Sequence, residues 1–281
     1  MTTATLPPTV APATARPGPL RRAACDATTL ALRVLLYYRH SPGLILASLI
    51  VPAVMVVVFG YVFGSAMTVP GGGDYREFLV PGLFAMVAVN GIMPTMIGAA
   101  RDIGRGVTDR LRSLSVSRPA VLLGQVVADL VVGVVVLLVL AAIGLAVGWR
   151  IRGGAADALT AFALLVLFRF TMTWMGIYLG LAVAKEDVAA QVGVLVLPVA
   201  MITNAFVPTG GMPGWLRTIA EWNPMSAVVT ACRDLFGNPG ALAADAPWPL
   251  EHPVAATLGW SALLLLVFVP LAVRKFSRHG R

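Results

Sequence analysis

Charged residues are scarce in this chain: 12% of its 281 residues are Asp, Glu, Lys or Arg, and 58% are hydrophobic. Soluble globular domains contain about 25% charged residues. A globular protein of this length cannot hide so much apolar surface from water, so an ordinary soluble fold is excluded and the bilayer is the expected solvent. The net charge of +8 does not indicate nucleic acid, because the basic residues form short clusters between apolar runs, as cytoplasmic flanks of membrane spans do.

Lysine is nearly absent, which limits the nucleotide chemistry open to the chain. Neither Lys185 nor Lys275 lies in a glycine-rich phosphate loop, and the glycine run at 71–73 is followed by Asp74 where such a loop requires lysine. We therefore expect no ATP hydrolysis by this polypeptide, and no cofactor bound to it.

Cysteine and histidine are too few for a disulfide framework or a metal site. Cys25 and Cys232 are expected on opposite sides of the membrane, so they should not pair. No metal-ligand spacing joins the three widely separated histidines, His40, His252 and His279. No Ser-His-Asp order, His-Glu-x-x-His motif or pair of acids within a span is present either. A membrane-embedded enzyme is thus an alternative without a supporting motif.

Six long apolar runs indicate an all-α polytopic membrane protein with about six transmembrane helices. Each reaches roughly the 20 residues needed to cross the hydrocarbon core. The runs cover residues 43–64, 78–99, 120–148, 158–183, 188–207 and 254–273. Pro52, Pro94 and Pro198 lie inside runs, where we expect kinks satisfied by neighbouring helices.

The distribution of basic residues predicts the orientation. With both termini inside, fifteen basic residues fall on the cytoplasmic side and five outside, with Arg169 within the fourth run. The positive-inside rule therefore places both termini in the cytoplasm. We expect the chain to be a multi-pass protein of the inner (plasma) membrane.

The N-terminal region divides in two ahead of the transmembrane domain, which we place at 43–279. Residues 1–24 are rich in Pro, Ala and Thr and predict a disordered cytoplasmic tail. Residues 25–42 predict an amphipathic helix at the cytoplasmic interface. Arg33, Tyr37 and Arg39 are the candidate site residues of this interfacial helix.

The connection after the second run predicts a short amphipathic helix rather than a simple loop. Val107, Leu111 and Leu114 are spaced i, i+4 and i+7, which puts them on one helical face. Charged residues surround this ridge: Asp109, Arg110 and Arg112. These charges either hold a partner protein or mark the cytoplasmic side and bind lipid headgroups, and the two leucines can equally pack on the bundle itself.

The stretch at 208–253 predicts a re-entrant or interfacial helical hairpin on the outer side. In its second helix Asn223 is the expected N-cap, Pro224 the first helical residue and Gly237 the stop. About a dozen residues are too few to cross and too apolar to float free. Trp215 and Trp222 are typical of an interfacial aromatic belt, with an outer gate as the alternative.

Two segments together resemble the type-2 ABC transporter permeases, and most closely the daunorubicin-type drug-export permeases. They are DRLRSLSVSRPAVLLGQVVAD at 109–129 and FVPTGGMPGWLRTIAEWNPMSAVVTACRDLFG at 206–237. The resemblance implies a permease that pairs as a homodimer or heterodimer and binds two separate ATPase subunits. ATP and magnesium would be held by those subunits. It also implies that the segment 107–114 couples to the ATPases, and that the cargo is a hydrophobic or amphipathic drug or antibiotic, with lipid or polysaccharide as the alternative.

Four polar residues within the runs are candidates for a substrate path: Asn90, Asp129, Arg169 and Asn204. An ionisable residue near mid-bilayer costs roughly 2.5–3.5 kcal/mol on insertion scales, so Arg169 needs a reason to be there. It either lines the path or pairs with Asp129. The asparagines either contact substrate or form hydrogen bonds between helices. A secondary transporter or channel is the rival function, although few ionisable residues in the runs support it.

Overall fold

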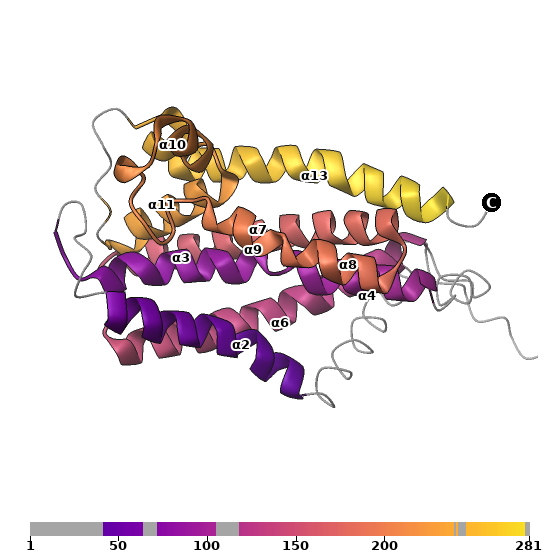
Figure 1. The fold of residues 1–281 in the computed structure, drawn as a ribbon, viewed down its shortest axis with the longest axis horizontal. Coiled ribbons are helices and arrows are strands. Elements are labelled where there is room, and N and C mark those ends of the chain that lie inside the picture. Colours follow the sequence, from indigo (N-terminus) through magenta and orange to yellow (C-terminus); the bar gives the residue numbers. More distant parts are fainter. Residues whose placement is uncertain (1–41, 64–71, 105–117, 239, 241–245, 279–281) are drawn as a thin grey trace, which may run out of the picture.

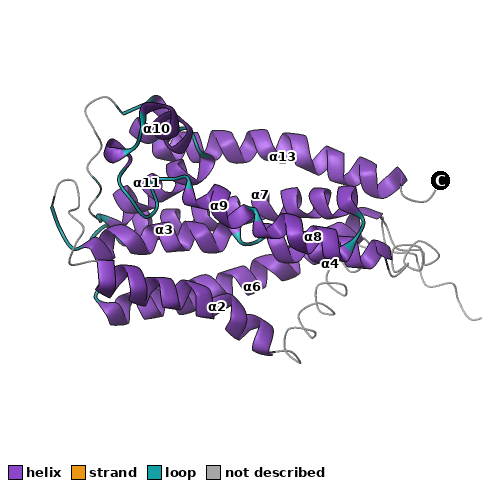
Figure 2. Ribbon diagram, viewed as in Figure 1, coloured by secondary structure: helices purple, strands orange, loops and turns teal. Residues whose placement is uncertain are grey.

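The computed structural model describes residues 42–63, 72–104, 118–238, 240 and 246–278. These residues form helices joined by loops, and no strand occurs among them (Figure 2). The long helices run side by side along the longest axis of the molecule (Figure 1). The all-helical class predicted from the sequence is therefore confirmed for the described part of the chain.

Four helices among the described residues are long and apolar enough to cross a membrane. They overlap four of the six predicted runs: Tyr75–Gly104, Leu122–Val147, Ala155–Val183 and Pro253–Ser277. The last three belong to α6 (Arg118–Val147), α7 (Ala155–Val183) and α13 (Pro253–Arg278). These spans follow from length and composition alone, which is why sequence could find them.

The first run forms α2 (Pro42–Val57), which passes directly into a π-helix, η1 (Val58–Phe63). Pro52 lies inside α2 without ending it. The predicted interfacial helix at 25–42 meets α2 at its last residue, and the rest of it lies outside the described residues.

The second run is divided into α3 (Tyr75–Val89) and α4 (Ile92–Gly104) by a turn at Asn90 and Gly91. Pro94 lies four residues after Asn90. Because proline has no backbone N–H and its ring crowds the carbonyl four residues earlier, it favours a break at this point.

The fifth run, predicted at 188–207 as one span, is not a continuous helix. It forms α8 (Glu186–Val194) and the short α9 (Val196–Met201), separated by a turn at Leu195. Pro198 lies four residues after Val194, the last residue of α8, so the same steric and hydrogen-bonding cause applies. Residues 202–208 are irregular.

Within the stretch at 208–253 the described residues form η2 (Thr209–Gly211), α10 (Gly214–Glu221), α11 (Pro224–Phe236) and α12 (Trp248–Glu251). The predicted signals of α11 are confirmed: the Asn223 side chain accepts a hydrogen bond from Met225 N, and Gly237 ends the helix with φ 68°. α11 packs against α3, α7 and α13. It is therefore a buried helix at one end of the bundle.

An aromatic cluster fixes that end of the bundle. The ring of Trp149 lies edge-on to those of Phe84 and Phe236, with centroids 5.2 and 5.1 Å away. Its indole Nε1 donates to Asn238 Oδ1 at 2.8 Å, and Phe236 O accepts from Arg152 N and Gly153 N. The loop between α6 and α7 is thereby held to the end of α11.

Apolar side chains also cover much of the outside of the bundle. Leu138 of α6 is 60% exposed and Leu266 of α13 is 74% exposed. Such a surface suits lipid rather than water.

Candidate functional site

The break in the second span deprives one backbone carbonyl of its helical hydrogen bond. In a continuous helix Gly91 N would donate to Val87 O, but here it donates to Ala88 O at 3.2 Å. Val87 O instead accepts from Arg169 Nη1 at 2.7 Å. A side chain from α7 therefore supplies the hydrogen bond that the break in the helix removes, as polar backbone inside a membrane requires.

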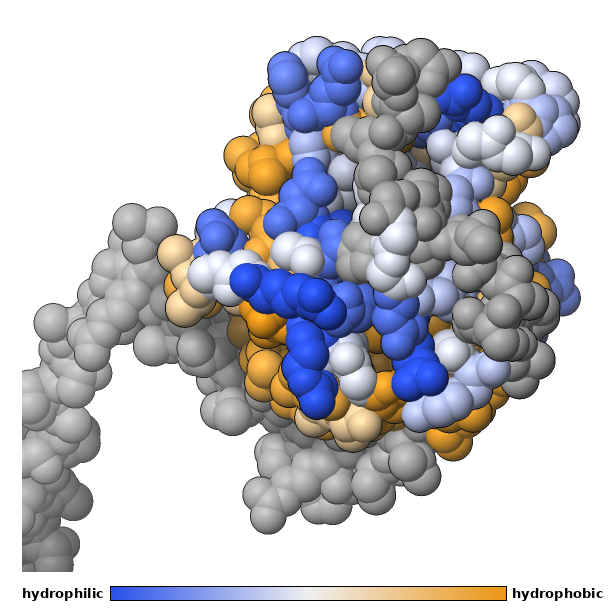
Figure 3. All heavy atoms as spheres, turned by 90° about the vertical axis from the view of Figure 1, so that its left-hand side faces the viewer, coloured by the Kyte–Doolittle hydropathy of each residue, from blue (hydrophilic) through white to orange (hydrophobic). Residues whose placement is uncertain are grey.

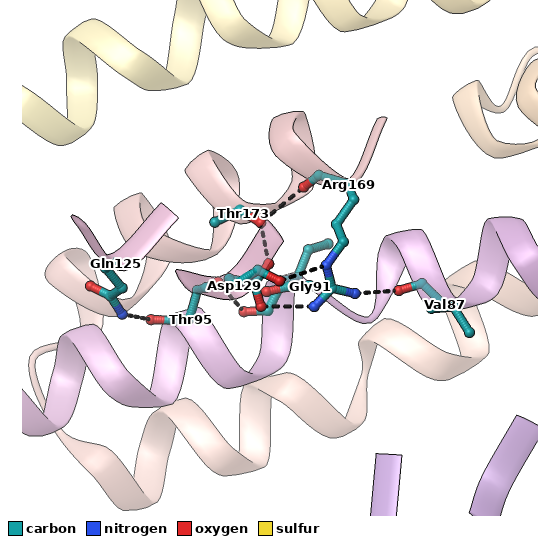
Figure 4. Close-up of polar contacts among 8 residues, drawn as sticks. Val87, Gly91, Thr95, Gln125, Asp129, Arg169 and Thr173 are labelled. Carbon is teal, nitrogen blue, oxygen red and sulfur yellow. Dashed lines mark hydrogen bonds and ion pairs between the residues drawn. The ribbon is translucent and has the colours of Figure 1, made fainter. Parts of the chain in front are cut away.

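Arg169 is held by an acid from a third helix. Its Nη2 lies 2.8 Å from Oδ1 of Asp129 on α6, and its Nε donates to Asp129 O at 3.3 Å (Figure 4). The two side chains are 6% and 5% exposed. The pairing alternative from the sequence is thus confirmed, and the charge of Arg169 is balanced inside the bundle.

The second oxygen of Asp129 is also satisfied. The Thr173 hydroxyl lies 2.7 Å from Asp129 Oδ2 and 2.9 Å from Arg169 O. The three side chains and the Val87 carbonyl form the charge cluster, which joins α3, α6 and α7. Removing one partner of such a buried pair typically costs about 3–5 kcal/mol, because the other charge stays buried.

Glycines make room for this cluster. A Cβ on Gly133 of α6 would collide with the guanidinium of Arg169. A Cβ on Gly91 would lie 3.2 Å from Thr173 Oγ1 and 3.3 Å from Arg169 Cγ. On α7, Gly176 and Gly180 would likewise collide with α4 at Ile92 and Met96 if they carried side chains. Close approach of small residues is the usual way in which membrane helices pack.

A second buried arginine lies at the end of the bundle that contains α11. Arg233 of α11 is 3% exposed, and it donates to Phe78 O, Asn204 O and Ala205 O at 2.9–3.0 Å. Its guanidinium carbon lies 3.5 Å from the centroid of the Phe78 ring. Burial lowers the pKa of Arg233 to about 9, so the group still carries its charge at neutral pH. Sequence reasoning counted Arg233 only as an outer charge.

Asn204, predicted as a candidate for the substrate path, lies beside Arg233, which donates to its backbone carbonyl. Its Nδ2 donates to Thr230 Oγ1 at 2.8 Å, and its backbone N donates to Ser226 Oγ at 3.1 Å. Both partners lie on α11. Asn204 therefore joins the irregular segment 202–208 to α11, whereas Asn90 is exposed in the turn beside the charge cluster.

At the opposite end of the bundle, α8 is attached to α4. Arg101 Nη2 and Nε lie 2.6 and 2.8 Å from Glu186 Oε1, and an ideal Cβ on Gly193 would come within 3.0 Å of Met93 Cγ. From the sequence alone Glu186 is one of three consecutive charged residues, Lys185, Glu186 and Asp187, with no sign of this contact. In the structure this residue links the start of α8 to the end of α4, immediately before the segment 105–117.

The remaining predicted site residues lie outside the described part of the chain. They are Arg33, Tyr37 and Arg39 of the interfacial helix, and Val107, Asp109, Arg110, Leu111, Arg112 and Leu114 of the coupling segment. Their roles stay predictions.

Comparison with known proteins decides the family. The family model for ABC-2 type transporters matches residues 27–236. The chain belongs to the ABC-2 type transporter family.

Three relatives in the family show how far the similarity extends. The daunorubicin resistance ABC transporter permease protein DrrB1 of Streptomyces coeruleorubidus is 31% identical over 93% of this chain and 90% of its own length. The probable doxorubicin resistance permease DrrC of Mycobacterium tuberculosis is 25% identical over 84% of this chain and 83% of its own. The probable multidrug permease YbhR of Escherichia coli is 25% identical over 67% of this chain and 52% of its own.

The region matched by the ABC-2 model contains the charge cluster, Arg101, Glu186 and Arg233. The contacts that hold α3, α6, α7 and α11 together thus lie inside the family domain. α13 follows the matched region and packs against α7 and α11.

Proposed function

We propose that this ABC-2 family member is the membrane-spanning permease subunit of an ATP-binding cassette exporter, and that a separate subunit hydrolyses the ATP. The family match over residues 27–236 is the observation that carries the proposal. Four membrane-length helices provide the permease body. The 281 residues contain no glycine-rich phosphate loop, so ATP and magnesium belong to the partner.

The proposed cargo is a hydrophobic or amphipathic small molecule such as a drug or antibiotic. Support comes from the relatives, whose names refer to daunorubicin and doxorubicin resistance. Lipid or polysaccharide is the alternative cargo. Asn90 is the best-placed of the four candidate path residues, because it is exposed where the second span is interrupted.

The proposed assembly has two permease chains, identical or different, and two ATPase subunits on the cytoplasmic side of the plasma membrane, where both termini of this chain lie. The segment 107–114 receives the movement of the ATPases. α4 ends at Gly104, just before this segment, and the Arg101–Glu186 ion pair connects α4 to α8. A displacement of the segment therefore acts on two helices rather than one.

In this scheme the charge cluster positions helices and does not carry the cargo. Arg169 uses its donors on Asp129 and Val87, and both carboxylate oxygens of Asp129 have partners. Because every partner in the cluster has a hydrogen bond, the break between α3 and α4 can act as a hinge while the Val87 carbonyl keeps its donor. A secondary transporter is the rival, since a buried Asp–Arg pair also suits ion coupling.

Co-purification tests the proposal. The tagged chain, extracted from the membranes of its own organism, should bring down a phosphate-loop ATPase, and the complex should hydrolyse ATP while the chain alone does not. A matched preparation carrying Leu111→Asp should recover less ATPase. Recovery of the chain with no such subunit, and no hydrolysis above background, would refute the proposal.

A further inference from the structure

The helix α10 has its charged residues turned inward and its apolar residues turned outward. Trp215 and Ile219 are 69% and 52% exposed, and Trp222, at the C-cap, is 50% exposed. They are spaced i, i+4 and i+7, so they share one helical face. A helix on a protein in water has the opposite arrangement, with its apolar face against the core.

The opposite face of α10 carries an ion pair within the helix and a hydrogen bond from the neighbouring η2. Arg217 Nε lies 2.7 Å from Glu221 Oε1, and the side chains are 24% and 9% exposed. Thr209 Oγ1 donates to the same Glu221 oxygen at 2.9 Å, and Ala220 between them is fully buried. Turning the tryptophans inward would bring the buried Ala220 and Glu221 to the surface and break the hydrogen bond from Thr209.

The position of α10 puts the exposed face beside the lipid-facing part of the bundle. It lies at the end of the molecule where α13 begins (Figure 1). α13 starts at Pro253, directly after α12 with its own exposed Trp248, and its outward residues Leu258 and Leu263 are 48% and 51% exposed. Seen from that end, hydrophilic residues gather centrally with hydrophobic residues beside them (Figure 3).

We propose that Trp215, Ile219 and Trp222 form a lipid-facing anchor, which lies in the headgroup region of the membrane leaflet at this end of the bundle. Indole suits this region because it combines a large apolar ring with one polar N–H group. Lipid is favoured over a second protein copy, because the anchor lies at the end of the bundle where the apolar outer surface of α13 begins, and three side chains on one face of a short helix offer little area for a stable protein interface. The anchor would hold α10, and through Glu221 and Thr209 the irregular segment before it, at a fixed depth.

Tryptophan fluorescence in liposomes tests the anchor. The emission lost on Trp215→Phe is isolated as the difference from the unchanged chain, and its quenching is measured with lipid brominated near the headgroup, lipid brominated near the chain end, and aqueous iodide. The matched control is Trp174→Phe, because Trp174 is only 4% exposed inside the bundle.

The anchor predicts that the Trp215 component is quenched several-fold more by the headgroup-proximal bromine than by either other quencher, while the Trp174 component responds weakly to all three. Adding Ile219→Trp to the Trp215→Phe chain should restore a component of the same kind. Strong iodide quenching without lipid quenching would mean water, and no quenching by any agent would mean a protein cover such as a second copy; either result overturns the anchor. The measurement uses neither ATP nor cargo, so its failure is distinct from failure of the proposed transport function.

Discussion

Replacing the two charged members of the cluster, singly and together, tests whether Asp129 and Arg169 are a coupled pair. Arg169→Met leaves the Asp129 carboxylate buried with Thr173 as its remaining side-chain partner. Loss of one partner from a buried pair costs about 3–5 kcal/mol. The free energy of unfolding, measured in a detergent titration, should therefore fall by roughly this amount. Asp129→Leu should cost a similar amount, because it leaves a guanidinium buried without its counter-charge.

The double variant Arg169→Met/Asp129→Leu should recover most of that loss, since no uncompensated charge remains. Recovery will be incomplete, because Val87 O also loses its donor, which costs about 1–3 kcal/mol for an unpaired buried group. We therefore expect a residual loss of about 1–3 kcal/mol and a coupling energy of several kcal/mol. Arg150→Met is the control, since Arg150 is exposed and donates only to nearby carbonyls among the described contacts. Additive effects of the two single changes would refute the reasoning.

Three further changes test separate parts of the structure. Gly133→Ala should destabilise the chain by about 1–3 kcal/mol, because the added methyl group collides with Arg169. Gly259→Ala is the control: it has open space around its Cβ and should be neutral or slightly stabilising in the same titration. Equal effects of the two changes would contradict the packing argument. Glu186→Arg should lower the amount of cargo moved per ATP, and adding Arg101→Glu should restore that amount by reversing the ion pair. Asp187→Arg, at an exposed neighbour, should change it little. A charge swap that does not restore transport would count against the link between α4 and α8. Leu111→Asp or Leu114→Asp should leave membrane insertion intact, but ATP should then be hydrolysed without moving cargo. Ser113→Asp, which lies off the predicted apolar face, should keep transport coupled to ATP. Normal transport by the leucine variants would disprove the coupling segment.

Sequence revealed those features that local composition determines. The spans of α6, α7 and α13 follow from the length of their apolar runs. The limits of α11 follow from Asn223 and Gly237, whose backbone roles are local. The pairing of Asp129 with Arg169 was one of two alternatives, because these were the ionisable residues found within runs and a buried charge needs a partner.

Features that depend on tertiary contacts could not be found in the same way. Glu186 looks like an ordinary charge in a tight turn until α8 is seen to pack on α4. Arg233 looks like an outer charge, and its burial arises only because α11 lies between α3, α7 and α13. For the fifth run, Pro198 signalled an interruption, but apolar composition alone favoured one span, and the turn at Leu195 shows that the proline prevails.

Transport by the reconstituted chain tests the central claim most directly. Liposomes containing the chain, with and without the proposed partner ATPase, would be supplied with daunorubicin on the outside, and uptake of the drug into the lumen would be followed with external ATP or with an imposed ion gradient. We predict movement only when both the ATPase and ATP are present. Movement driven by an ion gradient through the chain alone would contradict the assignment as an ATP-driven permease.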